Sequence, residues 1–271
     1  LCTKLLCLCR ASSPFRAWPM RPELAALLQR GDPTRFAALL AAPPAARAPL
    51  ATLYAFNLEV ARAPWASKEP MIAEMRLQWW RDTIEDAGRG VVRSHEVMAP
   101  LAELITARGL PLDVLDRLIE ARRWDIYTDA FADQPAMDTY IEDTAGGLMW
   151  LSGKALGATQ EHALRDFGWA AGLAAYFQAV PELVARGRIP LLDGRDEGIA
   201  ALAMRGLARL SAARKAGVEA KAHPAILAGW QAEGLLRLAA KEPGRVGDGS
   251  LQLSDFSRRG RLLWQAFTGR W

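Results

Sequence analysis

The feature of this sequence that most restricts its fold is a helical pattern that runs almost without interruption from Met20 to the C-terminus. Ala, Leu, Arg and Glu dominate this region, and no run of β-branched residues is long enough for a strand. The sequence therefore predicts an all-α protein with one helical domain over residues 20–271. Roughly ten helices are expected, near residues 33–42, 49–62, 71–86, 96–108, 112–131, 138–156, 160–186, 197–219, 224–241 and 254–268, and Pro181 is expected to kink or break one of them.

The charge of the chain gives no indication of a nucleic-acid partner. The net charge is +4, but residues 1–20 contain Lys4, Arg10 and Arg16 and no acid, so the remaining residues carry a net charge of only +1. A balanced surface of this kind lacks the basic patch that nucleic-acid binding needs. No stretch of the sequence is apolar over the roughly 18 residues that a membrane-spanning helix requires.

Residues 1–19 are set apart from the predicted domain, because the first methionine is Met20. They are interpreted as an upstream extension or as a targeting segment, since they are basic, contain serine and lack acids. All three cysteines, Cys2, Cys7 and Cys9, lie within them. The domain is therefore not expected to contain disulfides or a thiolate metal site, and its three widely spaced histidines disfavour a zinc site.

One reaction suits an all-α chain of this size: the ionisation of isoprenoid diphosphates inside a helical barrel. It needs aspartates three or four residues apart on two facing helices, because such pairs share a face and bind the Mg²⁺ that neutralises the departing pyrophosphate. The segment LYAFNLEVARAPW (53–65) resembles the first signature helix of the squalene/phytoene synthase family, Y-A-[FW]-C-R-x-x-D-D-x-x-D. Tyr54, Ala55 and Phe56 match, whereas Asn57 and Leu58 replace Cys and Arg, and Ala61, Arg62 and Trp65 occupy the three aspartate positions.

The second family signature is also present in a degenerate form. Segment 172–192 resembles the region in which the family has a D-x-x-x-D motif followed by G-R-x-Y-x-P. The tail survives as Gly187-Arg188-Ile189-Pro190, but Glu182 is the only acid between Phe177 and Arg186. A single carboxylate cannot hold a cluster of Mg²⁺ ions. No metal or other cofactor is therefore expected, and Mg²⁺ would be needed only if the chain were an active synthase.

The resemblance extends from about Asp32 to the C-terminus and includes the middle segment YIEDTAGGLMWLSGKALG (140–157). It implies an isoprenoid-synthase-type helical bundle. The resemblance is strongest to a branch of the family that is found in alphaproteobacteria. This branch has a mitochondrial relative, which is an assembly factor for respiratory complex I. Aspartate motifs are degenerate in that branch as well, and its members are regarded as non-catalytic.

Five residues are candidates for binding a substrate or ligand: Tyr54, Asn57, Glu59, Arg62 and Arg188. The resemblance places Tyr54 near a diphosphate, but a tyrosine on an apolar helix face is equally a core residue. Arg62 could bind an anion or pair with Glu59, the commoner outcome for opposite charges on one helix. Arg188 could bind a phosphate or be solvated.

The sequence is also rich in tryptophan, with ten residues, several of them beside arginines. Such pairs are typical of protein interfaces and of membrane surfaces, but tryptophan also fills volume between long helices. In the amphipathic helix predicted over 71–86, Met71, Met75 and Trp79 recur at i, i+4 and i+8. One of the adjacent Trp79 and Trp80 is expected in the core and the other at a surface or partner contact.

Three functions are compatible with these observations. The first is a non-catalytic scaffold that binds complex I subunits or another protein. The second is an active Mg²⁺-dependent prenyl diphosphate transferase with a displaced metal site, to which Glu59, Asp143 or Glu182 could contribute. The third is a protein that holds a quinone or prenyl lipid in an apolar cavity. A cytoplasmic protein, peripheral to the inner membrane or mitochondrial in a eukaryote, is expected.

Overall fold

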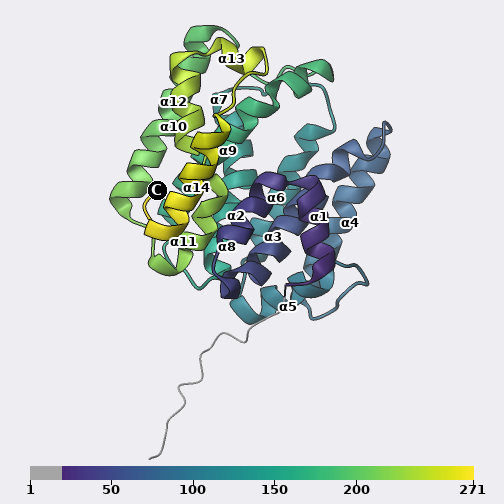
Figure 1. Cartoon of the computed structure of the whole chain (residues 1–271). Coiled ribbons are helices and arrows are strands. Elements are labelled where there is room, and N and C mark those ends of the chain that lie inside the picture. Colours follow the sequence, from purple (N-terminus) through teal and green to yellow (C-terminus); the bar gives the residue numbers. More distant parts are fainter. Residues whose placement is uncertain (1–19) are drawn as a thin grey trace, which may run out of the picture.

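The computed structural model describes residues 20–271, and the predictions made for residues 1–19 lie outside this range. The described chain is built from helices and contains no β-strand, which confirms the all-α prediction (Figure 1). The α-helices are α1 (Pro22–Gly31), α2 (Pro33–Ala41), α3 (Pro44–Arg62), α4 (Pro70–Gly88), α5 (Met98–Arg108), α6 (Leu112–Ala121), α7 (Gln134–Ile141), α8 (Gly147–Ala155), α9 (Glu161–Ala185), α10 (Asp196–Ala216), α11 (His223–Ile226), α12 (Ala232–Lys241), α13 (Gly244–Gly247) and α14 (Asp255–Thr268).

Several predicted helices are divided in the structure. The helix expected over 138–156 consists of α7, a π-helical turn η3 (Glu142–Gly146) and α8. The helix expected over 112–131 ends as α6 and continues only as the 3₁₀ turn η2 (Arg122–Asp125). That expected over 224–241 is divided by a second 3₁₀ turn, η5 (Leu227–Gly229). By contrast, the chain does not break at Pro181, because α9 continues through this residue to Ala185.

Local sequence accounts for where the helices that bear on the site begin. Proline occupies the first turn of each of the helices α1 to α4, where its missing N–H costs no intrahelical hydrogen bond. Asp32 caps α2, since its side chain accepts a hydrogen bond from the Arg35 amide at 2.9 Å. The buried side chains form a core that includes Phe56 of α3 and Trp169 and Phe177 of α9.

Helix α4 buries a different face from the one suggested by its methionines. Met71 and Met75 are exposed, and the buried positions are instead Ala73, Leu77, Trp80, Thr83, Ile84 and Ala87. Of the adjacent tryptophans, Trp80 is buried and Trp79 is half-buried, as expected for neighbours that point in different directions. The pattern correctly predicts a helix, but the packing against α5 and α6 selects the buried side.

Two glycines of α9 allow this helix to pack closely against the π-helical turn η3. A Cβ atom on Gly172 would lie 2.3 Å from the Cβ of Ala145 in η3, and one on Gly168 would lie 2.8 Å from the Ala145 carbonyl oxygen. The absence of side chains at these two positions lets α9 approach the π-helical turn, and η3 is thereby fixed beside the cavity described below.

No helix within residues 20–271 combines the length and the apolar character that crossing a bilayer requires.

Candidate functional site

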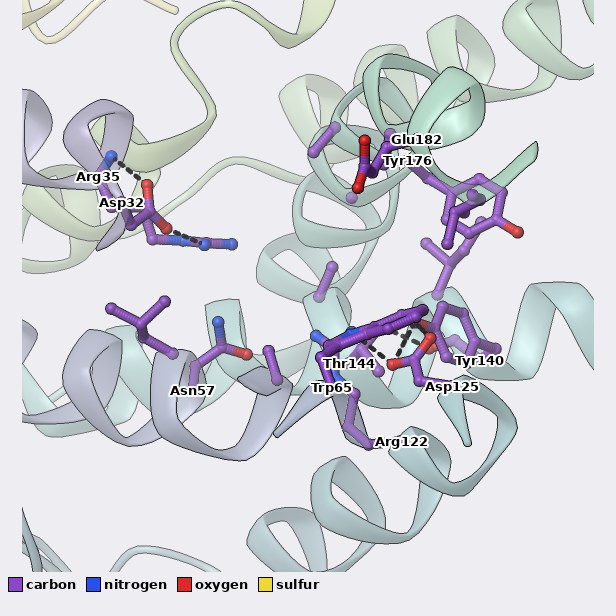
Figure 2. Close-up of a pocket in the computed structure, with 18 of the residues that line it drawn as sticks. Asp32, Arg35, Asn57, Trp65, Arg122, Asp125, Tyr140, Thr144, Tyr176 and Glu182 are labelled. Atoms are coloured by element: carbon purple, nitrogen blue, oxygen red, sulfur yellow. Dashed lines mark hydrogen bonds and ion pairs between the residues drawn. The ribbon is translucent and has the colours of Figure 1, made fainter. Parts of the chain in front are cut away.

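A cavity of about 400 Å³ opens between α3, α7, η3 and α9 (Figure 2). A second hollow of about 220 Å³ shares part of its wall, including Arg35, Ala145 and Gly172, and contacts Tyr54. The wall combines small and apolar side chains with a few charged ones. Its residues are Asp32, Arg35, Asn57, Leu58, Ala61, Trp65, Arg122, Asp125, Tyr140, Ile141, Thr144, Ala145, Gly172, Ala175, Tyr176, Ala179, Glu182, Leu183 and Arg186.

The first signature helix faces this cavity, but it presents apolar groups at the aspartate positions that reach the wall. Leu58, Ala61 and Trp65 line the wall, with Trp65 in the short 3₁₀ turn η1 (Ala63–Trp65) that follows α3. Arg62 lies outside the lining. Two of the three positions at which the family pattern has aspartate therefore point at the cavity without supplying a carboxylate.

Each acid that lines the cavity pairs with an arginine, and Figure 2 shows the contacts of Asp32 and Asp125. Asp32 pairs with Arg35 at 2.5 Å, where the distance joins a carboxylate oxygen to a guanidinium nitrogen. The pair between Asp125 and Arg122 measures 3.3 Å. Glu182 and Arg186, the third pair, are 2.7 Å apart. The three lining acids are thus matched by three lining arginines.

These residues do not fit a Mg²⁺ site. A cluster of Mg²⁺ ions needs several carboxylate oxygens that converge and are free to bind. Over residues 20–271, no three acids, histidines or cysteines come together in a way that could hold a metal ion. The cavity therefore lacks the ligands on which ionisation of a diphosphate depends.

The most deeply buried charges at the cavity belong to a cluster of Arg122, Asp125 and Tyr140. The Tyr140 hydroxyl donates to Asp125 at 3.1 Å and accepts from Arg122 at 2.9 Å. Burial raises the pKa of Asp125 above its ordinary value, and Arg122 opposes this shift. Burial likewise raises the pKa of the Tyr140 hydroxyl. The cluster joins η2 to α7 at the wall of the cavity.

Arg188, one of the predicted binding residues, is committed to the backbone of residues 124–127. Its guanidinium donates to the carbonyl oxygen of Trp124 at 2.8 Å and to those of Asp125 and Tyr127. It also lies over the ring of Trp65, 4.8 Å from the centroid. Only 6% of the residue is exposed, and burial lowers the pKa of the guanidinium.

The structure does not bring the other predicted binding residues together. Asn57 lies on the wall of the main cavity, and Tyr54 lies on the adjoining hollow with its hydroxyl 3.5 Å from the Ala225 carbonyl oxygen. Glu59 and Arg62 pair at 3.8 Å in a separate shallow pocket. A ligand-binding role for these residues remains a prediction. Of the four, only Asn57 lies on the wall of the main cavity, so a ligand there could contact it directly.

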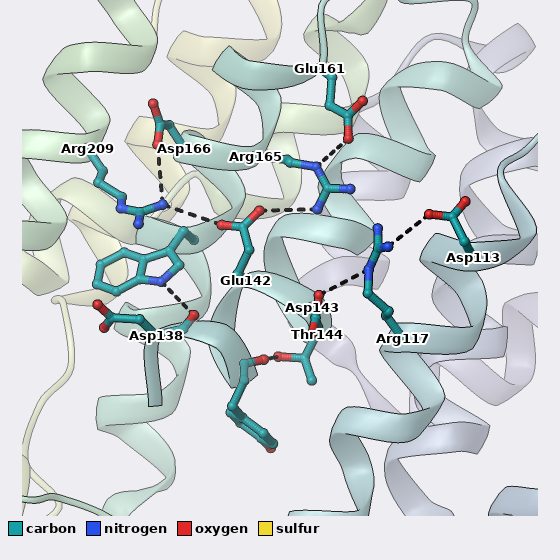
Figure 3. Close-up of polar contacts among 12 residues, drawn as sticks. Asp113, Arg117, Asp138, Glu142, Asp143, Thr144, Glu161, Arg165, Asp166 and Arg209 are labelled. Carbon is teal, nitrogen blue, oxygen red and sulfur yellow. Dashed lines mark hydrogen bonds and ion pairs between the residues drawn. The ribbon is translucent and has the colours of Figure 1, made fainter. Parts of the chain in front are cut away.

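The acids proposed for a displaced metal site are also separated. Asp143 of η3 lies 3.4 Å from Arg117 of α6 (Figure 3). Its neighbour Glu142 bridges Arg165 of α9 and Arg209 of α10 at 3.1 and 3.4 Å. Both carboxylates thus serve contacts between helices, and neither lines the cavity.

Some cavity residues were not among the predicted ones. Asp32, Arg35, Arg122 and Asp125 have no motif that marks them, and only their folded positions reveal them, whereas Tyr176 lies in segment 172–192, which resembles the second family signature. Tyr140 could have been found, because it is the first residue of the middle segment that resembles the family.

The fold and its cavity define an isoprenoid-synthase-type helical bundle, as expected. The structure matches the crystal structure of a dehydrosqualene synthase in complex with ligand with a TM-score of 0.72, over 92% of this chain and 95% of that chain, at 13% identity. It matches the squalene synthase from Alicyclobacillus acidocaldarius with a TM-score of 0.70, over 82% and 93% of the two chains, at 18% identity.

The sequence carries the assignment further. Residues 28–192 match the profile of squalene/phytoene synthases, and the chain therefore belongs to the squalene/phytoene synthase family. Among curated proteins it is 30% identical over 175 residues to the Drosophila melanogaster homolog of NADH dehydrogenase (ubiquinone) complex I, assembly factor 6, covering 61% of this chain and 52% of that protein. The Homo sapiens assembly factor 6 is 26% identical over 182 residues, with 66% and 55% covered. The chain thus spans about half the length of these relatives.

Proposed function

We propose that this chain is a non-catalytic member of the family that acts in the assembly of respiratory complex I, at the inner membrane that holds this complex. The observation that carries the proposal is the pairing of every lining acid with an arginine, in a cavity where Ala61 and Trp65 occupy two of the aspartate positions of the signature. The names of the Drosophila and human relatives support the assembly role. Complex I subunits are the partners that the proposal implies.

Two measurements test the two halves of the proposal separately. Purified protein incubated with farnesyl or geranylgeranyl diphosphate and Mg²⁺ is expected to release no more pyrophosphate than buffer does. Deletion of the gene in its host is expected to lower assembled complex I and NADH oxidation by membranes several-fold, with recovery when the gene is restored. Mg²⁺-dependent pyrophosphate release would establish an active prenyltransferase instead, and unchanged complex I would remove the assembly role.

A second candidate function rests on Asn57. The residue is only 5% exposed, yet its side-chain oxygen has no hydrogen-bond partner and lies on the cavity wall (Figure 2). A buried polar atom without a partner is costly unless a ligand supplies one. With the charges of the wall already matched, a ligand with an apolar tail and a neutral hydrogen-bonding head, such as a quinol or prenyl alcohol, suits the cavity best.

The substitution Asn57→Leu separates a ligand contact from a structural one. We expect it to raise the free energy of unfolding by about 1 kcal/mol, because leucine has a similar volume and the buried carboxamide oxygen that it removes has no hydrogen-bond partner. We also expect several-fold less lipid in mass spectra of organic extracts of the purified protein. Loss of stability would show that the carboxamide stabilises the fold. If extracts of the unsubstituted protein contain no lipid, the proposed lipid ligand is contradicted.

A further inference from the structure

The C-terminal helix α14 lies on the outside of the molecule and buries none of its residues (Figure 1). It begins at an N-cap, Ser254, whose hydroxyl accepts from the Ser257 amide. It packs on α2 and η5. The side of α14 that faces the protein includes half-buried Leu262 and Gln265, and the latter donates to the Trp230 carbonyl oxygen at 3.5 Å.

The opposite side of α14 is apolar and open. Phe256, Leu263, Trp264 and Phe267 follow one another at i, i+7, i+8 and i+11, a spacing that places them within about 100° of each other around the helix. Their exposed fractions are 89%, 55%, 58% and 87%. An apolar stripe of this kind on the solvent side of a helix indicates a docking surface.

The charges around this stripe are predominantly positive. Residues 254–271 contain four arginines, Arg258, Arg259, Arg261 and Arg270, and a single acid, Asp255, which pairs with Arg258 at 3.4 Å. Within the described part of the chain, neither Arg259 nor Arg270 forms an ion pair. A partner surface that complements both the stripe and these arginines is therefore both apolar and anionic.

We propose that α14 docks the protein on the anionic surface of a lipid bilayer. The aromatic rings insert at the level of the headgroups, where tryptophan and phenylalanine partition favourably, and the arginines pair with lipid phosphates. An acidic protein surface would match the arginines, but it would leave two almost fully exposed phenylalanine rings without the deep apolar layer that the bilayer offers. The contact is peripheral, because the helix lies flat on the bundle.

Vesicle sedimentation of the full chain tests this proposal. We expect binding to vesicles of phosphatidylcholine with phosphatidylglycerol, with little binding to phosphatidylcholine alone and a marked loss on raising the salt from about 50 to 300 mM. The double substitution Phe256→Ser and Phe267→Ser is expected to weaken binding by about tenfold or more, because each ring contributes apolar area. Arg259→Ala with Arg270→Ala is expected to abolish the preference for anionic vesicles.

The matched control is Met71→Ser with Met75→Ser, which removes two exposed apolar side chains from α4 and is expected to leave vesicle binding unchanged. Circular dichroism should show that all three variants keep their helices, since every substituted side chain is exposed or lies on the outer surface. The proposal is overturned if the protein ignores anionic vesicles. It is equally overturned if the phenylalanine variant binds them normally, or if that variant only converts a dimer into monomers.

Discussion

Replacing Arg188 by methionine is expected to lower the free energy of unfolding by about 3–5 kcal/mol, a large part of the stability of an ordinary domain. The substitution keeps much of the apolar stem but leaves three carbonyl oxygens, of Trp124, Asp125 and Tyr127, without their donor. It also removes one of the two guanidinium groups that lie over the ring of Trp65, the other being that of Arg186. Urea unfolding followed by far-ultraviolet circular dichroism measures the difference.

Arg186→Ala is the matched control for this experiment. Arg186 lies two residues earlier, is exposed, and pairs with Glu182 of α9, an interaction worth no more than about 1 kcal/mol. It also lies over the ring of Trp65, as Arg188 does, so the two variants lose the same kind of contact with this ring and differ in the hydrogen bonds to the backbone. If Arg188 were instead a solvated residue held ready for an anion, its methionine variant would be as stable as the Arg186 variant. Equal midpoints for the two variants would therefore show that the buried contacts of Arg188 contribute little.

The contrast between these two arginines shows what the sequence could and could not predict. The Gly-Arg-Ile-Pro segment marks Arg188 as a residue of interest, because it resembles a family motif. Its acceptors lie more than 60 positions earlier, in and after η2, and no local pattern connects the two segments. The formation of a helix depends on local sequence and was predictable. The contact partner of a long side chain depends on how the helices pack, and was not.

The same reasoning explains the π-helical turn. Residues 138–156 are predicted as one helix, and although the adjacent Gly146 and Gly147 weaken that helix, nothing in the periodicity requires η3 between α7 and α8. The turn changes which residues face inward: Thr144 and Ala145 line the cavity, while Glu142 and Asp143 pair with arginines of α6, α9 and α10. Extra residues inserted into a helix commonly reposition side chains at functional sites. The sequence predicts that residues 138–156 are helical, but only the folded structure shows which of their side chains line the cavity.

The substitution Gly168→Ala tests whether α9 must pack closely against η3. A Cβ atom at position 168 would lie 2.6 Å from the Cβ of Met149, 2.8 Å from the Ala145 carbonyl oxygen and 2.9 Å from the Cα of Gly146. Two of these atoms belong to the backbone of η3, which cannot move aside as a side chain can. We expect a loss of about 2–3 kcal/mol in the free energy of unfolding, since the strain exceeds the gain in helix propensity of about 1 kcal/mol.

Gly260→Ala supplies the control, because it makes the same change within a helix where a Cβ atom would meet nothing within 4 Å. Here the helix propensity of alanine acts alone, so stability is expected to rise by about 0.5–1 kcal/mol. Opposite signs for the two variants, measured by urea unfolding, would show that contact with η3 is what requires glycine in α9. A stabilised Gly168→Ala variant would mean that α9 and η3 can separate at little cost, and the wall of the cavity would then be adjustable rather than fixed by this contact.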